Sequence, residues 1–288
     1  MNASVSPLKT EWPAPLTARE WDQRFPGILD GIGLVAAGAN IIMQLGLPPV
    51  GYGVAESKVT SGSIFHHPIK RTRTTLTYLA VAMLGNDEEK QAYRMAVNRS
   101  HAQVRSDENS PVKYNAFDPK LQLWVAACLY WGYVDILEKM NGKLSREKAE
   151  ELYKLAEPLG TTLQVRADMW PATLDEFDAY WRANLVNLQI DDHIRKVLLD
   201  IAELDFMPAP VKFLFGRFNR FVTAGFLPAE MREQMNLSWS DAQQRRFERV
   251  LSVVFGINRL VPRVVRQAPP LWLMRDFRKR LRQNKATV

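Results

Sequence analysis

Apolar residues recur at intervals of three and four along most of this chain, a pattern that predicts α-helices rather than strands. The clearest cases are residues 70–84, which Gly85 ends, and residues 121–140, which Asp118-Pro119 introduces as an N-cap followed by proline. No segment alternates apolar and polar residues between hairpin turns. The sequence therefore predicts an all-α fold of about ten helices.

Local capping signals support several of these helices. Thr173 and Ser240 each stand three residues before a Glu or Gln, which is the spacing of a capping box. Asp87 is the expected N-cap of a helix that continues through residues 93–105. Because no stretch resembles a linker, we expect a single bundle-like domain that spans residues 1–288.

The 93–105 segment places a histidine among apolar side chains. One helical face of this segment consists of Tyr93, Val97, His101 and Val104. Arg105 follows His101 by one turn, on nearly the same side. A histidine on an apolar face is most often a packed core residue. The other interpretation is a ligand beside an anion-binding guanidinium, although a single histidine is a weak indication of a metal site.

The positive charge of the chain is concentrated at its C-terminus. The 288 residues have a formal net charge of +7. Residues 261–288 contain eight Lys and Arg and one Asp, so they carry this whole excess, and the remaining residues balance. Since the rest of the fold has no basic surplus, no nucleic-acid partner is expected.

No feature of the sequence indicates export or a disulfide framework. The N-terminus lacks a signal-peptide pattern, and the single cysteine, Cys128, lies in an apolar run. Residues 28–50 are the one apolar stretch of membrane-spanning length, but Asp30, Asn40 and several glycines interrupt it, so a buried helix is expected. Residues 51–68 are expected to form a loop with one helical turn. The expected location is cytoplasmic, with membrane association through the C-terminal tail.

This tail, at about residues 268–288, is predicted to be a basic amphipathic helix. Its apolar residues lie near one helical stripe and are Leu271, Met274, Phe277 and Leu281. Such a helix would make peripheral contact with an anionic membrane surface. The alternative is that the stripe packs on the protein's own core and the arginines face water.

The residues available for chemistry are few. His66 and His67 precede a proline, His193 lies in a polar run, and neither HExxH nor GxSxG occurs. What remains is the RTRTT run at 71–75 and the HAQVR run at 101–105. These residues would suit haem, with one histidine as axial ligand and arginines beside the propionates. Alternatively, the arginines cap helices and face water.

Five segments resemble the MpaB-type oxygenase family, which includes the latex clearing protein that cleaves rubber. They cover most of the chain in family order and at family-like spacing, and they are residues 36–57, 67–85, 97–105, 114–129 and 227–247. The resemblance implies an all-helical fold. In the rubber-cleaving members it also implies haem b, whose iron is held by the histidine of an H-x-x-V-R segment. By position this histidine is His101, and Arg105 completes the motif.

The resemblance also implies roles for residues on the other side of the haem. Arg71, Arg73 and Thr74 match the family's Arg-rich stretch and are expected as propionate or distal-side residues. Lys70 is a further distal candidate. Where many relatives carry a histidine, this chain has Glu56, a carboxylate that would act as a base.

The implied function is that of a haem-b-dependent oxygenase. It would use dioxygen to cleave a double bond in an apolar small molecule such as an isoprenoid or a lipid. Two alternatives stay open at this point. One is a noncatalytic haem-binding or lipid-binding protein of the same fold. The other is a family member that has lost haem, in which His101 is merely packed.

Overall fold

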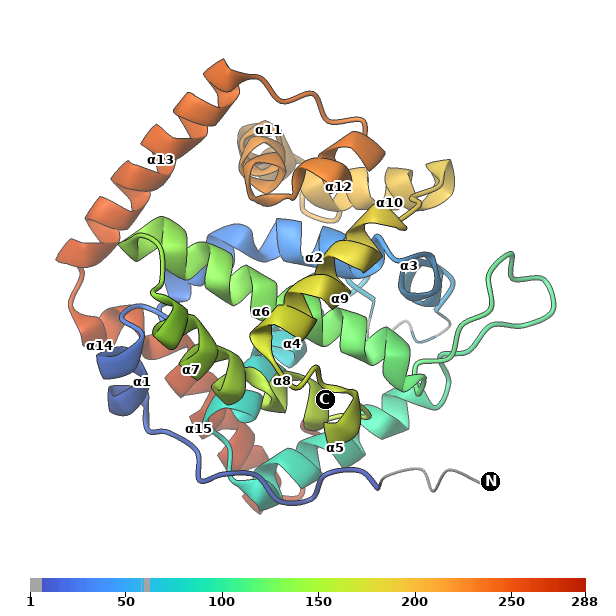
Figure 1. Cartoon of the computed structure of the whole chain (residues 1–288). Helices are drawn as coiled ribbons and strands as arrows, with labels where there is room; N and C mark the ends of the chain where they lie inside the picture. The colour runs from blue at the N-terminus through green and yellow to red at the C-terminus, as the bar shows by residue number, and fades with distance from the viewer. Residues whose placement is uncertain (1–6, 58, 60–62) are drawn as a thin grey trace.

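The computed structural model describes residues 7–57, 59 and 63–288, and these form helices joined by short connections (Figure 1). The described residues contain no strand, only an isolated bridge between Arg105 and Asn115. The all-α prediction is therefore confirmed. The helices, in chain order, are α1 (Ala18–Arg24), the 3-10 helix η1 (Gly31–Ala36), α2 (Ala37–Leu45), α3 (Pro48–Ala55), α4 (Pro68–Leu84), α5 (Asp87–His101), α6 (Pro119–Asn141), α7 (Arg146–Ala156), α8 (Pro158–Thr161), the 3-10 helix η3 (Ala167–Met169), α9 (Leu174–Val186), α10 (Asp192–Ala202), α11 (Ala209–Phe226), α12 (Ala229–Gln234), α13 (Asp241–Leu260), α14 (Arg263–Arg266) and α15 (Ala268–Arg282).

The prediction of about ten helices is too low, because it misses short helices. Both α8 and α14 have only four residues. Such short helices contain too few apolar positions for a periodic pattern to show.

Helix α6 is the centre of the core, and Figure 1 shows it crossing the middle of the molecule. The Asp118 carboxylate accepts a hydrogen bond from the Lys120 N–H, so the predicted cap and proline start are both present. α6 packs against α2, α7, α8 and α13. Trp124 of α6 is fully buried and stacks on Trp181 of α9, with ring centroids 5.2 Å apart. The main core therefore surrounds α6.

The region before α4 differs from its prediction. Instead of one helix and a loop, η1, α2 and α3 follow one another. Pro48 and Pro49 begin α3, where their missing N–H groups cost no helical hydrogen bond. Gly51 allows α3 to turn back closely, because a Cβ there would lie 2.4 Å from the Leu45 carbonyl oxygen.

No single helix among the described residues is long and apolar enough to cross a membrane. Gly31–Leu45 and Pro48–Ala55 have the required length and composition only when taken together, and they meet at a bend of 106°.

Helix α5 starts and ends differently from its prediction. Its N-cap is Asn86 rather than Asp87, and Asn86 and Glu89 form a reciprocal capping box. The helix ends at His101, so the predicted continuation to residue 105 is wrong. The reason is that the Ala116 N–H donates to the Val104 carbonyl, which pairs this extended segment with the residues just after the following loop.

The apolar stripe of α15 packs on the protein itself. Met274 and Phe277 are buried in a cluster with Val81 of α4 and Tyr93 of α5. Arg278 adds an ion pair to Glu89 of α5, with Nε 2.6 Å from Oε1. The apolar stripe of the tail therefore packs on the protein's own core, which was the alternative to a membrane-binding helix.

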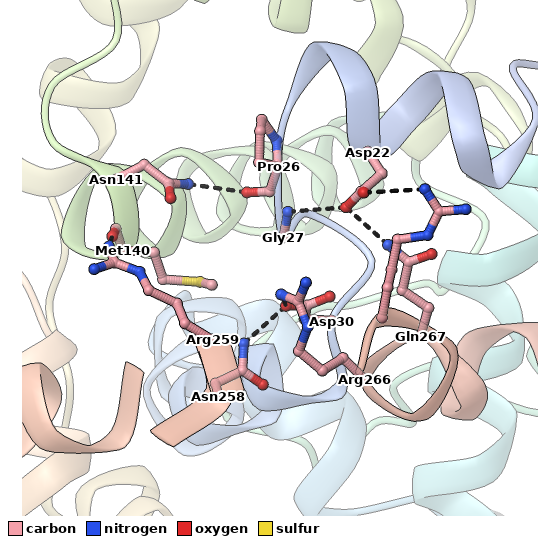
Figure 2. Close-up of polar contacts among 11 residues, drawn as sticks. Asp22, Pro26, Gly27, Asp30, Met140, Asn141, Asn258, Arg259, Arg266 and Gln267 are labelled. Atoms are coloured by element: carbon pink, nitrogen blue, oxygen red, sulfur yellow. Dashed lines mark hydrogen bonds and ion pairs between the residues drawn. The ribbon is translucent and has the colours of Figure 1, made fainter. Parts of the chain in front are cut away.

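A polar cluster joins the start of the chain to its end (Figure 2). The buried Asp30 carboxylate accepts hydrogen bonds from Asn258 of α13 and Arg266 of α14. Asp22 of α1 accepts a hydrogen bond from the Gln267 side chain at 2.8 Å. The turn between α1 and η1 is therefore fixed against the C-terminal helices.

Candidate functional site

The site lies where α4 and α5 are held side by side. The Tyr93 hydroxyl of α5 donates a hydrogen bond of 2.6 Å to the Thr74 carbonyl of α4. The ring of Tyr93 also lies 6.0 Å from that of Tyr78, centroid to centroid. These contacts fix the register of the two helices, so His101 and Arg71 face one cavity.

This space, which we call the histidine cavity, has a volume of about 260 Å³. It is lined by His101 and Arg71 together with largely apolar residues from α2, α3, α4, α5 and α6. Val97 of α5, Leu129 of α6 and Leu163, which follows α8, provide aliphatic surface. The cavity therefore combines one imidazole and one guanidinium with a wall whose surface is mostly apolar, although hydroxyl and amide side chains such as Ser100 and Gln122 also line it.

His101 is neutral in this environment. Burial, and to a smaller extent the neighbouring Arg71 charge, together lower the pKa of its imidazole to about 4. Its Nδ1 is buried and has no hydrogen-bond partner among the described residues. A buried polar atom without a partner costs about 1–3 kcal/mol. The imidazole thus has an unused nitrogen in a cavity large enough for a ligand.

Arg71 stands between two cavities and has no acidic partner among the residues that the structure describes. It has exposed surface, but protein atoms surround the guanidinium, so this surface faces the cavities rather than open water. Loss of hydration accordingly lowers the pKa of Arg71. A cation in such a position favours binding of an anion.

The second space, which we call the apolar cavity, has a volume of about 270 Å³. It lies between η1, α2, α4, α6 and α15, and Arg71, Thr75 and Leu129 line both cavities. Leu76, Leu79 and Met83, which gave α4 its helical pattern in the sequence, line its wall. The apolar cavity therefore adjoins the histidine cavity at Arg71.

The other predicted site residues are divided between these cavities and their surroundings. Thr74 lines the histidine cavity. Lys70 is exposed, and neither Lys70 nor Arg73 lines the histidine cavity or the apolar cavity. Arg105, beyond the end of α5, lines a different pocket with Glu56. The structure thus brings together His101, Arg71 and Thr74, but not the remaining four residues.

Glu56 lies in a polar pocket of about 230 Å³, which we call the glutamate pocket. Its carboxylate accepts hydrogen bonds from the Ser110 hydroxyl and from the Tyr114 hydroxyl, the latter at 3.0 Å. Burial and the hydrogen bond to Glu56 raise the pKa of Tyr114. Because Tyr114 also lines the histidine cavity, it connects Glu56 with the space in front of His101.

Sequence reasoning missed Tyr114, and it included Thr75 only as part of the RTRTT run, without giving it a role. Thr75 had a usable signal, because it follows Arg71 by four positions and must share its helical face. The same helical spacing places Arg71, Thr74 and Thr75 on one face of α4 and Arg73 on another. Tyr114 had no such signal, since a loop brings it to the site.

The described residues contain no group of three or more His, Cys, Asp or Glu that would hold a bare metal ion. A haem iron differs in this respect, because the porphyrin supplies four ligands and the protein needs to add only one. His66, His67 and His193 do not line the histidine cavity, so His101 is its one imidazole among the described residues.

Comparison with known proteins identifies the family. The family model for the catalytic domain of ER-bound oxygenase mpaB/B′ and rubber oxygenase matches residues 27–255. The chain therefore belongs to this oxygenase family, which confirms the resemblance in the sequence. It is also 53% identical, over 224 residues, to a protein of Mycobacterium bovis and to one of Mycobacterium tuberculosis, both described as uncharacterized. The match covers 78% of this chain and 88% of each relative. No solved structure matches the chain.

Proposed function

We propose that the protein is a haem-b-dependent oxygenase that uses dioxygen to cleave a double bond in an apolar, isoprenoid or lipid-like substrate. The observation that carries the proposal is the state of His101. Its imidazole is held neutral, one of its nitrogens lacks a partner, and it lines a cavity with apolar walls. The neutral imidazole is the form that ligates iron.

The residues of the histidine cavity fit a haem in two respects. His101 would hold the iron, and Arg71, which has no acidic partner among the described residues, would pair with a propionate. When bound, haem supplies the reaction with dioxygen. Because His101 is the one imidazole of the cavity among the described residues, it alone would hold the iron.

The substrate would occupy the apolar cavity, on the other side of Arg71. Aliphatic side chains such as Leu76, Leu79 and Leu273 line it. These side chains form no hydrogen bonds with water. An apolar chain bound there would gain hydrophobic contacts along its length. These walls orient the chain towards the histidine cavity and exclude water from the reacting groups.

Two polar residues would act from the edge of the histidine cavity. Thr74 lines it directly, whereas Glu56 reaches it only through its hydrogen bond with Tyr114. Glu56 would therefore be a positioning residue that orients the Tyr114 hydroxyl, rather than a base in contact with substrate. The distal or propionate roles of Lys70, Arg73 and Arg105 stay predictions from the resemblance, because none of them lines the two cavities.

Hemin titration of the purified chain tests the haem part of the proposal. The wild type should develop a Soret band at one equivalent of hemin. His101→Ala should lose or shift that band, whereas His67→Ala, which changes an exposed histidine on the loop before α4, should retain it. Circular dichroism of each variant shows that the fold is kept. If the wild type takes up no hemin, the protein is not a haem oxygenase.

Aerobic turnover tests the reaction itself. The hemin-loaded protein, with a reductant, is incubated with unsaturated fatty acids and short polyisoprenoids, and carbonyl products are measured. Products that depend on dioxygen and on His101 support the oxygenase. Haem binding without products from either class would favour the noncatalytic haem carrier instead.

A further inference from the structure

The first half of α11 exposes four large apolar side chains within six residues. Phe213 is 86% exposed, Leu214 66% and Phe215 54%, and they are consecutive. Phe218, one turn further along, is 49% exposed. We call these four residues the α11 patch. Single exposed apolar residues are ordinary, but a cluster of three phenylalanines on one helix end indicates an interaction surface.

The way α11 is anchored explains why the α11 patch stays uncovered. Gly216 is buried against the end of α10, where a Cβ would lie 2.5 Å from the Glu203 carbonyl oxygen. Val222 and Phe226, in the second half of the helix, are buried in the main core. The helix is thus held along one side and at its C-terminal end, and its first turns present their phenylalanines outward.

One positive charge on α11, that of Arg217, is available to an anionic partner. The helix contains three basic residues, Lys212, Arg217 and Arg220, and no acidic residue. Lys212 and Arg220 form ion pairs with Asp205 and Glu203. Arg217 has no ion-pair partner among the residues that the structure describes. An unpaired arginine among exposed phenylalanines is typical of helices that lie in the headgroup region of an anionic bilayer.

Helix α11 is also connected with the apolar cavity through η1. Helix α11 packs against η1, and η1 in turn packs against α15. Leu34 of η1 is 44% exposed and lines the apolar cavity, as does Pro269 of α15. Helix η1 therefore contacts α11 and also contributes, with α15, to the wall of the apolar cavity.

We propose that the protein docks on anionic lipid bilayers through the α11 patch, with Arg217 at the level of the lipid phosphates. Docking in this orientation holds the opening of the apolar cavity at the membrane surface, so an apolar substrate enters from the lipid phase. That second statement rests on the proposed oxygenase function, whereas docking itself does not. The site differs from the C-terminal tail that the sequence indicated, whose apolar stripe is buried.

Co-sedimentation with vesicles tests the docking without haem or turnover. The full chain is mixed with vesicles of phosphatidylcholine alone or with added phosphatidylglycerol, at low and high salt. Binding should require phosphatidylglycerol and weaken with salt. Phe213→Ser combined with Phe218→Ser should reduce vesicle affinity at least about tenfold. Arg217→Gln should weaken binding to the anionic vesicles and reduce its dependence on salt.

The matched control is Met95→Ser on α5, which removes another exposed apolar side chain, 63% accessible, and should leave binding unchanged. Equal losses for the control and the α11 variants would overturn the assignment to α11. Absence of wild-type binding to anionic vesicles would overturn the proposal, whatever the outcome of the hemin titration. Light scattering measures the oligomeric state of the wild type and of the phenylalanine variant. If the wild type is a dimer and the variant a monomer, the α11 patch is a protein interface and the proposal is overturned.

Discussion

Asp30 and Arg266 lie 236 positions apart in the sequence and form an ion pair of 2.5 Å in the core. The Asp30 side chain has no accessible surface, and that of Arg266 has 19%. One carboxylate oxygen of Asp30 and the Nε of Arg266 have no partner among the described residues. The pair thus fixes the start of η1 against α14, although its hydrogen bonding is incomplete.

Removing the cation from this pair should be costly. Arg266→Met leaves the buried Asp30 carboxylate with only the Asn258 amide, so we expect the free energy of unfolding to fall by about 3–5 kcal/mol. Urea denaturation measures this change. The control is Arg263→Met, which breaks a longer, more exposed pair with Asp22 and should cost at most about 1 kcal/mol. Similar losses in both variants would mean that Asp30 is not held by Arg266.

The low pKa of His101 makes stability depend on pH in a defined window. The imidazole has a pKa of about 4 in the folded protein and about 6.5 when unfolded. Between these values the unfolded chain binds a proton that the folded chain does not, so stability falls as the pH drops from 6.5 to 4. The loss is on the order of 3 kcal/mol.

His101→Leu removes this titration, so the wild type should lose stability relative to the variant across that window. Parallel stability curves for the two proteins would contradict the prediction. An NMR titration of the His101 ring protons should give a midpoint near pH 4 in the same samples.

Arg71 contributes to the low pKa of His101, but less than burial does. Arg71→Met should therefore raise the pKa of His101 while leaving it below its ordinary value, because the desolvation persists. The NMR titration of His101 measures the change. Arg73→Met, which alters a residue outside the histidine cavity, is the control and should shift the midpoint less. If both variants had the same effect, Arg71 would not be the charge that His101 senses.

Two glycines offer a comparison between a crowded and an open position on helices. A Cβ at Gly225 of α11 would lie 2.4 Å from the Phe247 ring, which is fully buried and in contact with Phe226. Gly225→Ala should therefore destabilise the protein by about 1–3 kcal/mol. A Cβ at Gly256 of α13 meets no atom within 4 Å. Gly256→Ala should then be neutral or stabilise the fold by up to about 1 kcal/mol.

Thermal unfolding of the two alanine variants measures both effects. A loss at Gly256 equal to that at Gly225 would show that the contact with Phe247 is not the cause.

Features of the fold that depend on neighbouring residues could be predicted from the sequence. Ser240 and Gln243 form the expected reciprocal capping box at the start of α13. Thr173 caps α9 as expected, but the Glu176 carboxylate binds the Ala172 N–H instead of the Thr173 N–H. Local spacing therefore identifies the cap, while the exact partner depends on how the preceding chain approaches.

The candidate site could be predicted in part for the same reason. Helical spacing and family resemblance pointed to His101 and Arg71, and both line one cavity. Arg105 was expected beside His101 on a continuous helix. It lies elsewhere because the chain after His101 bridges to Asn115, a pairing across ten residues that spacing along one helix cannot reveal. Glu56 likewise depends on the same loop, through Tyr114.

The C-terminal helices have a consequence for how this domain is delimited. The family match ends at residue 255, but α15 contributes Leu273 to the apolar cavity and covers Val81 with Phe277. A fragment trimmed to the matched residues would open that wall and strip Asp30 of its counter-ion. The folded domain therefore extends past the matched residues, because its last helices complete one wall of the apolar cavity and the packing around Val81.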